Sequence, residues 1–189
     1  MFQLIKIVLV INLFCFSFFA NAQKNTNTGV RTFYIVRHAE KDTGNNPVLS
    51  GAGLIRAGEL YRVLKNRHLD KIYTTKYRRS QMTADSLRIY SGIDTVYYNA
   101  DTTGNGVEEK INQQPGPQKN ILVIAHSNTI APIIKKLGIT NFKLKEIPEN
   151  EFDNLYIITK RKGSVRIQYK KYGTASNKNN EGNKMKPLQ

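Results

Sequence analysis

The chain has 189 residues, and its 29 lysines and arginines against 14 acidic residues give a net charge of +15 with histidine neutral. A hydrophobic fraction of 40% and a charged fraction of 23% are those of a globular chain and exclude a wholly disordered or collagen-like protein. The single cysteine excludes a disulfide framework and a cysteine-based metal site, and three histidines limit other metal chemistry. The length fits one domain.

The first 22 residues differ from the rest of the chain. Residues 7–20 are almost unbroken apolar, Lys6 is the only charge in the segment, and the segment ends in Ala-Asn-Ala. A weakly basic start, a short apolar core and such an end are typical of a secretory signal peptide. The apolar run is shorter than the ~20 residues that span a bilayer, so we favour cleavage after Ala22 over a retained anchor. Cys15 lacks the neighbouring small residues of a lipid-attachment site.

The expected mature chain begins at Gln23, has no cysteine, and belongs in the periplasm or outside the cell. We expect a polar leader over residues 23–30 and one domain over residues 31–172. Residues 173–189 are rich in Asn, Lys and Gly with almost nothing to bury, which predicts a disordered basic tail.

The domain alternates between segments of two kinds. Short runs rich in β-branched and aromatic residues predict strands, whereas apolar residues at helical spacing predict helices. In chain order, the expected elements are a strand at 33–36, a helix at 49–67, a strand at 72–74, a helix at 78–90, strands at 95–98 and 121–125, a helix at 128–137, and strands at 155–159 and 165–169. Ser50 is expected to cap the first helix, and Gly92 and Gly138 to end the other two. Lys162 and Gly163 are expected to form the turn between the last two strands.

This alternation predicts an α/β fold. The expected architecture is a three-layer sandwich, in which a mostly parallel sheet carries helices on both faces. The strand at 121–125 is entirely apolar, which is typical of a strand buried on both faces. The last two strands are expected to add an antiparallel edge.

Basic and titratable residues follow three of the expected strands. Arg37 and His38 follow the first, a basic cluster ending in Arg78 and Arg79 follows the second, and His126 follows the fourth. Ligands of open α/β sheets bind outside the carboxyl ends of the strands, so these side chains should converge. Arginine binds phosphate oxygens bidentately, and a neutral imidazole can attack phosphorus. Neighbouring arginine charges would lower the histidine pKa and keep the ring neutral. The pattern therefore predicts a site for phosphate or another small oxyanion.

Four segments resemble motifs of the histidine phosphatase superfamily, which is also called phosphoglycerate-mutase-like. Residues 33–41, FYIVRHAEK, are similar to its R-H-G/A signature, and residues 49–53, LSGAG, to its L-T/S-x-x-G stretch. Residues 74–84, TTKYRRSQMTA, resemble its S-S-x-x-x-R-A-x-x-T-A segment, and residues 121–129, ILVIAHSNT, its second-histidine motif. The matches occur in the superfamily's order and cover most of the predicted domain. The pair R-H-A-E-K and H-S-N-T further resembles one subgroup.

The resemblance implies a phosphoglycerate-mutase-like fold and a catalytic role for four residues. His38 would be the nucleophile and carry a phosphohistidine intermediate, which water then hydrolyses. Arg37, Arg79 and His126 would bind the phosphoryl oxygens; in this register the second arginine is Arg79 and not Arg78. The resemblance implies no metal and no cofactor, because these four residues supply the charge.

Superfamily members that act on alcohol phosphates usually have an acid that protonates the leaving oxygen, on an insertion after the second arginine segment. Here that region, residues 99–114, is short. Asp101, Glu108 and Glu109 are candidates, with Glu40 as another by proximity in sequence, and the sequence does not decide among them. A short insertion predicts an open site, which suits a phosphorylated macromolecule or an exposed phosphate on a glycan.

The motifs favour a secreted or periplasmic phosphomonoesterase over two alternatives. A phosphoglycerate mutase is disfavoured by the signal peptide and the short insertion. A non-catalytic phosphate- or polyanion-binding module is favoured by the net charge, although the basic residues are spread over the chain.

Partners are less sharply predicted than the reaction. No nucleic-acid fold signature is present, so we expect no specific nucleic acid partner, and no stable membrane anchor after signal cleavage. The expected substrates are phosphorylated small molecules, glycans and phosphoproteins; the sequence leaves the choice among them and the oligomeric state open. His68 is expected to be an ordinary surface residue.

Overall fold

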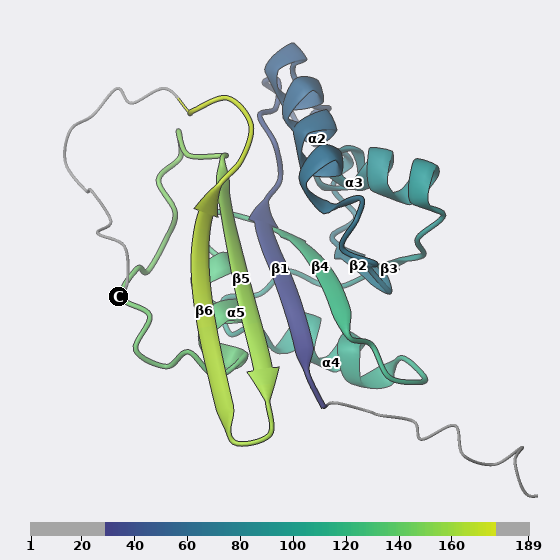
Figure 1. Cartoon of the computed structure of the whole chain (residues 1–189). Coiled ribbons are helices and arrows are strands. Elements are labelled where there is room, and N and C mark those ends of the chain that lie inside the picture. The colour runs from purple at the N-terminus through teal and green to yellow at the C-terminus, as the bar shows by residue number, and fades with distance from the viewer. Residues whose placement is uncertain (1–28, 177–189) are drawn as a thin grey trace, which may run out of the picture.

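The computed structural model describes residues 29–176, so the predicted signal peptide and most of the predicted leader and tail lie outside the described residues. Within that range, six strands form one sheet in the order β3-β2-β4-β1-β5-β6, and four helices pack on it (Figure 1). The strands are β1 (Arg31–Arg37), β2 (Lys71–Thr74), β3 (Thr95–Tyr97), β4 (Asn120–Ala125), β5 (Asn154–Arg161) and β6 (Ser164–Lys171). The helices are α2 (Gly51–Leu64), α3 (Arg78–Ser91), α4 (Asn105–Gln113) and α5 (Ile130–Lys136).

The sheet is mostly parallel, as predicted. Strands β3, β2, β4 and β1 pair in parallel, whereas β5 is antiparallel to both β1 and β6. The expected antiparallel edge is therefore present. Residues 121–125 of β4 are fully buried, because this strand lies in the middle of the sheet and is covered on both faces.

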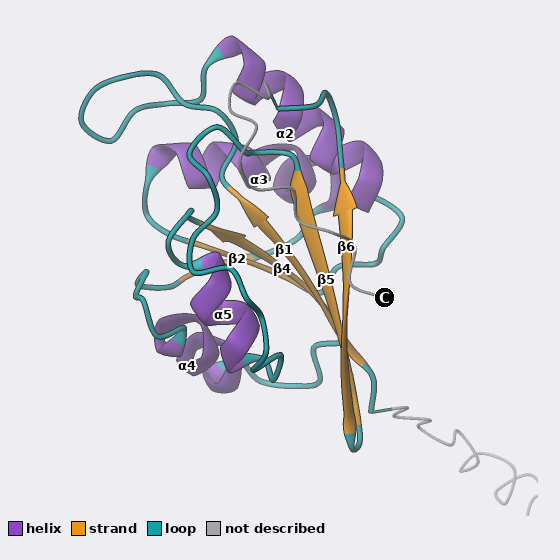
Figure 2. Cartoon of the chain, turned by 90° about the vertical axis from the view of Figure 1, so that its left-hand side faces the viewer, coloured by secondary structure: helices purple, strands orange, loops and turns teal. Residues whose placement is uncertain are grey.

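Helices cover both faces of the sheet, which gives the predicted three layers (Figure 2). Leu60 of α2 and Leu87 of α3 pack with Leu122 on one face. Ile111 of α4 and Ile134 of α5 share the core of the other face with its strands. Between residues 29 and 176, no helix is both long and apolar enough to cross a membrane.

The first helix starts where the sequence predicts, and its glycine has a packing role. The Ser50 side chain accepts a hydrogen bond from Gly53 N at 3.3 Å, which caps α2. A Cβ on Gly53 would stand 2.0 Å from the carbonyl oxygen of Glu40. Only glycine therefore lets α2 approach the loop that follows β1.

Helix α4 is not predicted by the sequence, and its residues are mostly polar. Its nine residues contain only two apolar side chains that are buried, Val107 and Ile111, which lie one turn apart and face the core. Asn105 and Gly106 at its start favour a turn on sequence grounds. Gly106 is required there, since a Cβ would stand 2.1 Å from the Asn99 carbonyl oxygen.

Candidate active site

The register of β1 and β4 brings two histidines together. The strands are parallel with Arg37 opposite Ala125, and His38 N donates to Ala125 O at 2.9 Å. His38 and His126 therefore leave the sheet at the same edge, and their ring centroids are 5.3 Å apart. Both residues are buried, at 3% and 8% exposed.

The His38 ring is held as a neutral base. Its Nδ1 lies 2.8 Å from the carbonyl oxygen of Ala39. A carbonyl only accepts, so Nδ1 carries the proton and Nε2 keeps its lone pair. Burial lowers the pKa of His38 from 6.5 to about 3, and the charges of Arg37, His126 and Arg79 act in the same direction. The expected arginine effect is present, but burial is the larger cause.

His126 is fixed by hydroxyl groups. Its Nε2 lies 3.0 Å from Thr75 Oγ1, and its backbone N donates to Thr129 Oγ1 at 3.0 Å. The Tyr77 ring meets it edge-on, with centroids 5.4 Å apart. Burial first, and then the charges of Arg79 and Arg37, lower the pKa of His126 to about 4. This ring is also neutral at neutral pH.

Arg37 is a buried cation in which some N–H donors are paired and one is not. Its Nη1 donates to the carbonyl oxygens of Pro148 and Glu149 at 3.0 and 2.9 Å, and the ring of Phe152 lies 4.3 Å from its guanidinium carbon. Its Nε is buried and has no hydrogen-bond partner within the described residues. An unpaired buried N–H costs about 1–3 kcal/mol, so this donor is suited to a ligand oxygen.

Arg79 offers a second donor of the same kind. Its Nε is also buried without a partner in the part of the chain that the structure describes, and its guanidinium carbon lies 4.3 Å from the centroid of the Tyr77 ring. The charge of Arg79 acts on both histidines, whereas Arg78 is exposed. The structure thus places Arg79, and not Arg78, with the other three predicted site residues.

Helix α3 is tied to the segment that carries His38. Thr83 Oγ1 donates to Arg79 O at 2.7 Å and accepts from Ala39 N at 2.9 Å. One hydroxyl group therefore fixes the first turn of α3 against the residue after the nucleophile candidate. Thr83, near the end of the sequence segment at 74–84, therefore has a positioning role that the motif alone does not reveal.

Together, the four residues form a compact cationic site with a free imidazole lone pair. Two neutral imidazoles and two guanidinium groups can bind a dianionic phosphoryl group and offer a nucleophile to its phosphorus. Exposed His68 lies apart from them, since it follows α2 and its carbonyl accepts from Asn120 Nδ2. The prediction that His68 is a surface residue is confirmed.

The four acids considered from the sequence have other partners. Glu40 accepts three hydrogen bonds from the buried Arg56, at 2.6–2.9 Å. Glu108 pairs with Lys136 at 3.1 Å, at the far end of α5, and Glu109 accepts from Gln113 within α4.

Asp101 caps the start of α4. Burial works to raise its pKa, but hydrogen bonds from Thr103 and from the backbone of Gly106 outweigh it and lower the pKa to about 2. A carboxyl group with this pKa is ionised at neutral pH and is a poor proton donor.

Two carboxylates that sequence reasoning missed lie against the site. Ser127 follows His126, and its Oγ lies 2.8 Å from Glu149 Oε1 and 3.1 Å from Glu146 Oε1. The other Glu149 oxygen, Oε2, is 2.5 Å from Arg37 Nη2. Both acids belong to the loop after α5, and their sequence, K-E-I-P-E-N, carries no periodic or motif signal that could have found them.

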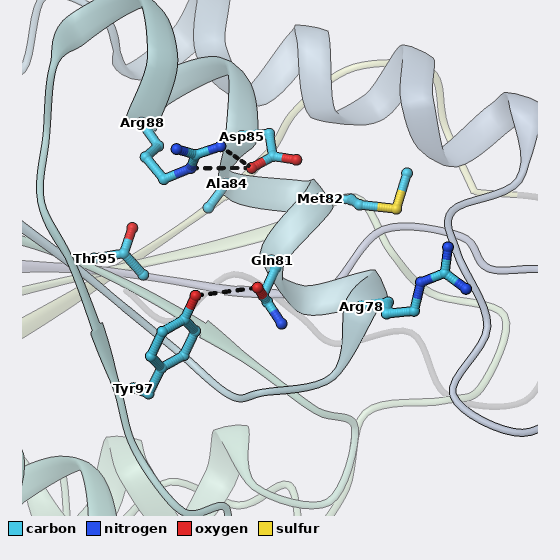
Figure 3. Close-up of a pocket in the computed structure, with 8 residues that line it drawn as sticks. All are labelled: Arg78, Gln81, Met82, Ala84, Asp85, Arg88, Thr95 and Tyr97. Atoms are coloured by element: carbon cyan, nitrogen blue, oxygen red, sulfur yellow. Dashed lines mark hydrogen bonds and ion pairs between the residues drawn. The ribbon is translucent and has the colours of Figure 1, made fainter.

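A groove of about 500 Å³ runs beside α3 and the edge strand β3 (Figure 3). It includes Arg78 but none of the four predicted site residues. Four of its polar side chains pair with one another: Arg88 with Asp85 at 3.0 Å, and Tyr97 OH with Gln81 at 3.1 Å. We place no reacting group there.

The acids and histidines of the described chain are not grouped as metal ligands. Between residues 29 and 176, no group of three or more His, Cys, Asp or Glu side chains is arranged to hold a metal ion.

The fold matches solved structures at low sequence identity. Mycobacterial glucosyl-3-phosphoglycerate phosphatase is 16% identical with a TM-score of 0.55, over 76% of this chain and 98% of that one. SixA from Agrobacterium tumefaciens, described as a putative phosphohistidine phosphatase, is 15% identical with a TM-score of 0.56, over 73% and 96%. Phosphoglycerate mutase from Bacillus anthracis strain Sterne is 16% identical with a TM-score of 0.52, over 77% and 94%.

All three are members of the histidine phosphatase superfamily, so the chain has the phosphoglycerate-mutase-like fold. The resemblance noted in the sequence is confirmed at the level of the fold, and the R-H-A-E-K subgroup stays a prediction. No family model and no curated protein sequence matches the chain.

Proposed function

We propose that the protein is a phosphatase of the histidine phosphatase superfamily, which hydrolyses phosphomonoesters through a phosphohistidine on His38. One observation carries this proposal. The free Nε2 lone pair of a buried neutral histidine lies among two arginines whose buried Nε groups have no partner within residues 29–176. This arrangement leaves a nucleophile and unpaired phosphate donors at the same edge of the sheet.

In the proposed reaction, His38 Nε2 attacks phosphorus, a P–N bond forms and the P–O bond to the leaving group breaks. The leaving oxygen takes up a proton. Water then attacks the phosphohistidine, the P–N bond breaks, and inorganic phosphate is released. Arg37, Arg79 and His126 stabilise the charge on the transferring phosphoryl group at both steps. These side chains supply the charge that a metal ion provides in other phosphoryl-transfer enzymes, so we propose that no metal is required.

The compared structures support a phosphate ligand. The mycobacterial phosphatase has also been solved in complex with inorganic phosphate. We propose a phosphorylated small molecule, glycan or phosphoprotein as substrate, and we place the reaction in the periplasm or outside the cell because the sequence predicts a signal peptide. The likeness to a phosphoglycerate mutase favours mutase activity as a second candidate.

The test is hydrolysis of para-nitrophenyl phosphate in chelator by the wild-type protein and by His38→Asn. We expect turnover in the wild type and a loss of at least about a thousandfold in the variant. His68→Asn is the matched control, because His68 is exposed at a φ of +49° that asparagine tolerates; it should keep wild-type activity. Turnover that survives His38→Asn would overturn the role of His38 as nucleophile. A folded wild type with no turnover would overturn the phosphatase and favour a binding module. Incubation with 3-phosphoglycerate distinguishes a mutase, which would yield the isomer instead of phosphate.

A further inference from the structure

The proposed reaction needs a proton for the leaving oxygen, and the loop after α5 brings carboxyl groups to the site. Glu149 touches residues from both sides of the site: Arg37 at the end of β1 and Ser127 just beyond β4. Its charge also acts on Arg79. The Glu149 side chain is 75% exposed while that of Arg37 is 3% exposed. The carboxylate thus lies at the mouth of the phosphate site, on its solvent side.

We infer that Glu149 is the catalytic acid that protonates the leaving oxygen, an inference that rests on the proposed phosphatase function. The buried side of the site belongs to His38 and the unpaired arginine donors. A leaving group that departs in line with the attack of His38 moves away from that imidazole and towards solvent. Glu149 is placed on that solvent side and is held there by two hydrogen bonds.

Substrate binding would change how readily the Glu149 carboxyl group is protonated. In the free protein, burial works to raise the pKa of Glu149, but hydrogen bonds from Ser127 and Arg37 outweigh it and keep the pKa below its usual range. A bound phosphoryl dianion would engage Arg37 and add negative charge beside Glu149. Both changes favour the protonated acid, so substrate binding itself would favour protonation of Glu149.

A second glutamate lies on the same hydroxyl group. Ser127 Oγ is 2.8 Å from Glu149 Oε1 and 3.1 Å from Glu146 Oε1. The hydroxyl has one hydrogen and can donate to only one of the two carboxylates at a time. The two glutamates therefore compete for one donor, so the Ser127 hydrogen bond that lowers the pKa of Glu149 is shared.

Glu149 gives up a proton in the first step of the proposed cycle and regains one in the second. In the first step the P–O bond breaks and the proton of Glu149 passes to the leaving oxygen, which leaves a carboxylate. In the second step that carboxylate takes a proton from the attacking water, and the new P–O bond forms as the P–N bond breaks. The acid is restored with no other reactant.

The test compares an ester that needs protonation with one that does not. Para-nitrophenolate leaves readily without a proton, whereas the alkoxide of β-glycerol phosphate does not. In Glu149→Gln, kcat/KM for the alkyl ester should fall about a hundredfold, and the ratio of alkyl to para-nitrophenyl rates should fall at least about tenfold. The basic limb of the alkyl pH–rate profile should disappear. Glu149→Asp keeps the acid and should restore part of the alkyl rate.

Glu108→Gln is the matched control, because Glu108 is paired with Lys136 away from the site; it should leave both rates unchanged. An equal loss on both esters, or no loss on the alkyl ester, would overturn the role of Glu149. Failure of the phosphatase itself looks different, because the wild type would then show no His38-dependent hydrolysis of para-nitrophenyl phosphate.

Discussion

The two halves of the site are built in different ways. The cationic half stands on strand ends and the first turn of α3: β1 sets Arg37 and His38, β4 sets His126, and α3 sets Arg79. The acidic half stands on an irregular loop, where Glu146 contacts Ser127 and Glu149 contacts both Ser127 and Arg37. In the proposed reaction, regular structure fixes the groups that bind phosphate and attack phosphorus, whereas the loop supplies the acid that protonates the leaving group.

This difference predicts that the cationic half is sensitive to small changes of geometry. Arg79→Lys keeps the charge but removes the planar guanidinium and its buried Nε. We expect kcat/KM for para-nitrophenyl phosphate to fall about a hundredfold. Arg78→Lys changes the exposed neighbouring arginine and is the matched control, with wild-type kinetics expected. Wild-type kinetics in both variants would show that a positive charge alone is enough at position 79, and would break the distinction between the two halves.

The cationic half also depends on how closely α2 approaches the loop after β1. In Gly53→Ala, the new Cβ would meet the Glu40 carbonyl oxygen at 2.0 Å. We expect the free energy of unfolding to fall by about 2 kcal/mol or more, measured by denaturant titration. Gly58→Ala in the same helix meets nothing within 4 Å and should raise it by about 0.5–1 kcal/mol. If Gly53→Ala is as stable as Gly58→Ala, the close packing of this segment is not required.

The buried neutral histidine gives a smaller effect that depends on pH. Burial lowers the pKa of His38 from 6.5 to about 3, so between these pH values the unfolded chain binds a proton at His38 and the folded protein does not. The contribution of this lowered pKa to the free energy of unfolding is fully present above pH 6.5 and is lost as the pH falls towards 3. Between pH 6 and pH 5 the wild type should lose about 1 kcal/mol more stability than His38→Asn. Parallel pH dependences would show that His38 is not held neutral by the fold.

The same comparison explains what the sequence could reveal. Apolar strands carry a strong signal, and parallel strands end at one edge, so the sequence alone suffices to place Arg37, His38 and His126 together. The assignment of Arg79 rests on a motif register, and the structure gives its physical reason, since Thr83 ties the first turn of α3 to Ala39.

The parts that the sequence did not predict depend on tertiary contacts. Helix α4 is held by two buried side chains in a polar segment, which is too weak a signal to recognise. Glu149 follows a proline in a loop, and contacts with residues far along the chain place it at the site. Buried Arg37 donates to the carbonyl oxygens of Pro148 and Glu149, and Ser127 contacts the Glu149 carboxylate. A residue positioned by a contact across more than a hundred positions leaves no local pattern.

The role of His38 as carrier of the phosphoryl group is the central claim, and trapping the intermediate tests it most directly. The full-length protein is mixed with substrate in chelator and quenched in denaturant at alkaline pH, where phosphohistidine persists, and the adduct is mapped by peptide mass spectrometry. We expect a phosphoryl group on the imidazole of His38 in the wild type, with a larger fraction trapped in variants that hydrolyse the intermediate slowly. An adduct on His126, or steady turnover with no adduct on His38, would contradict this role.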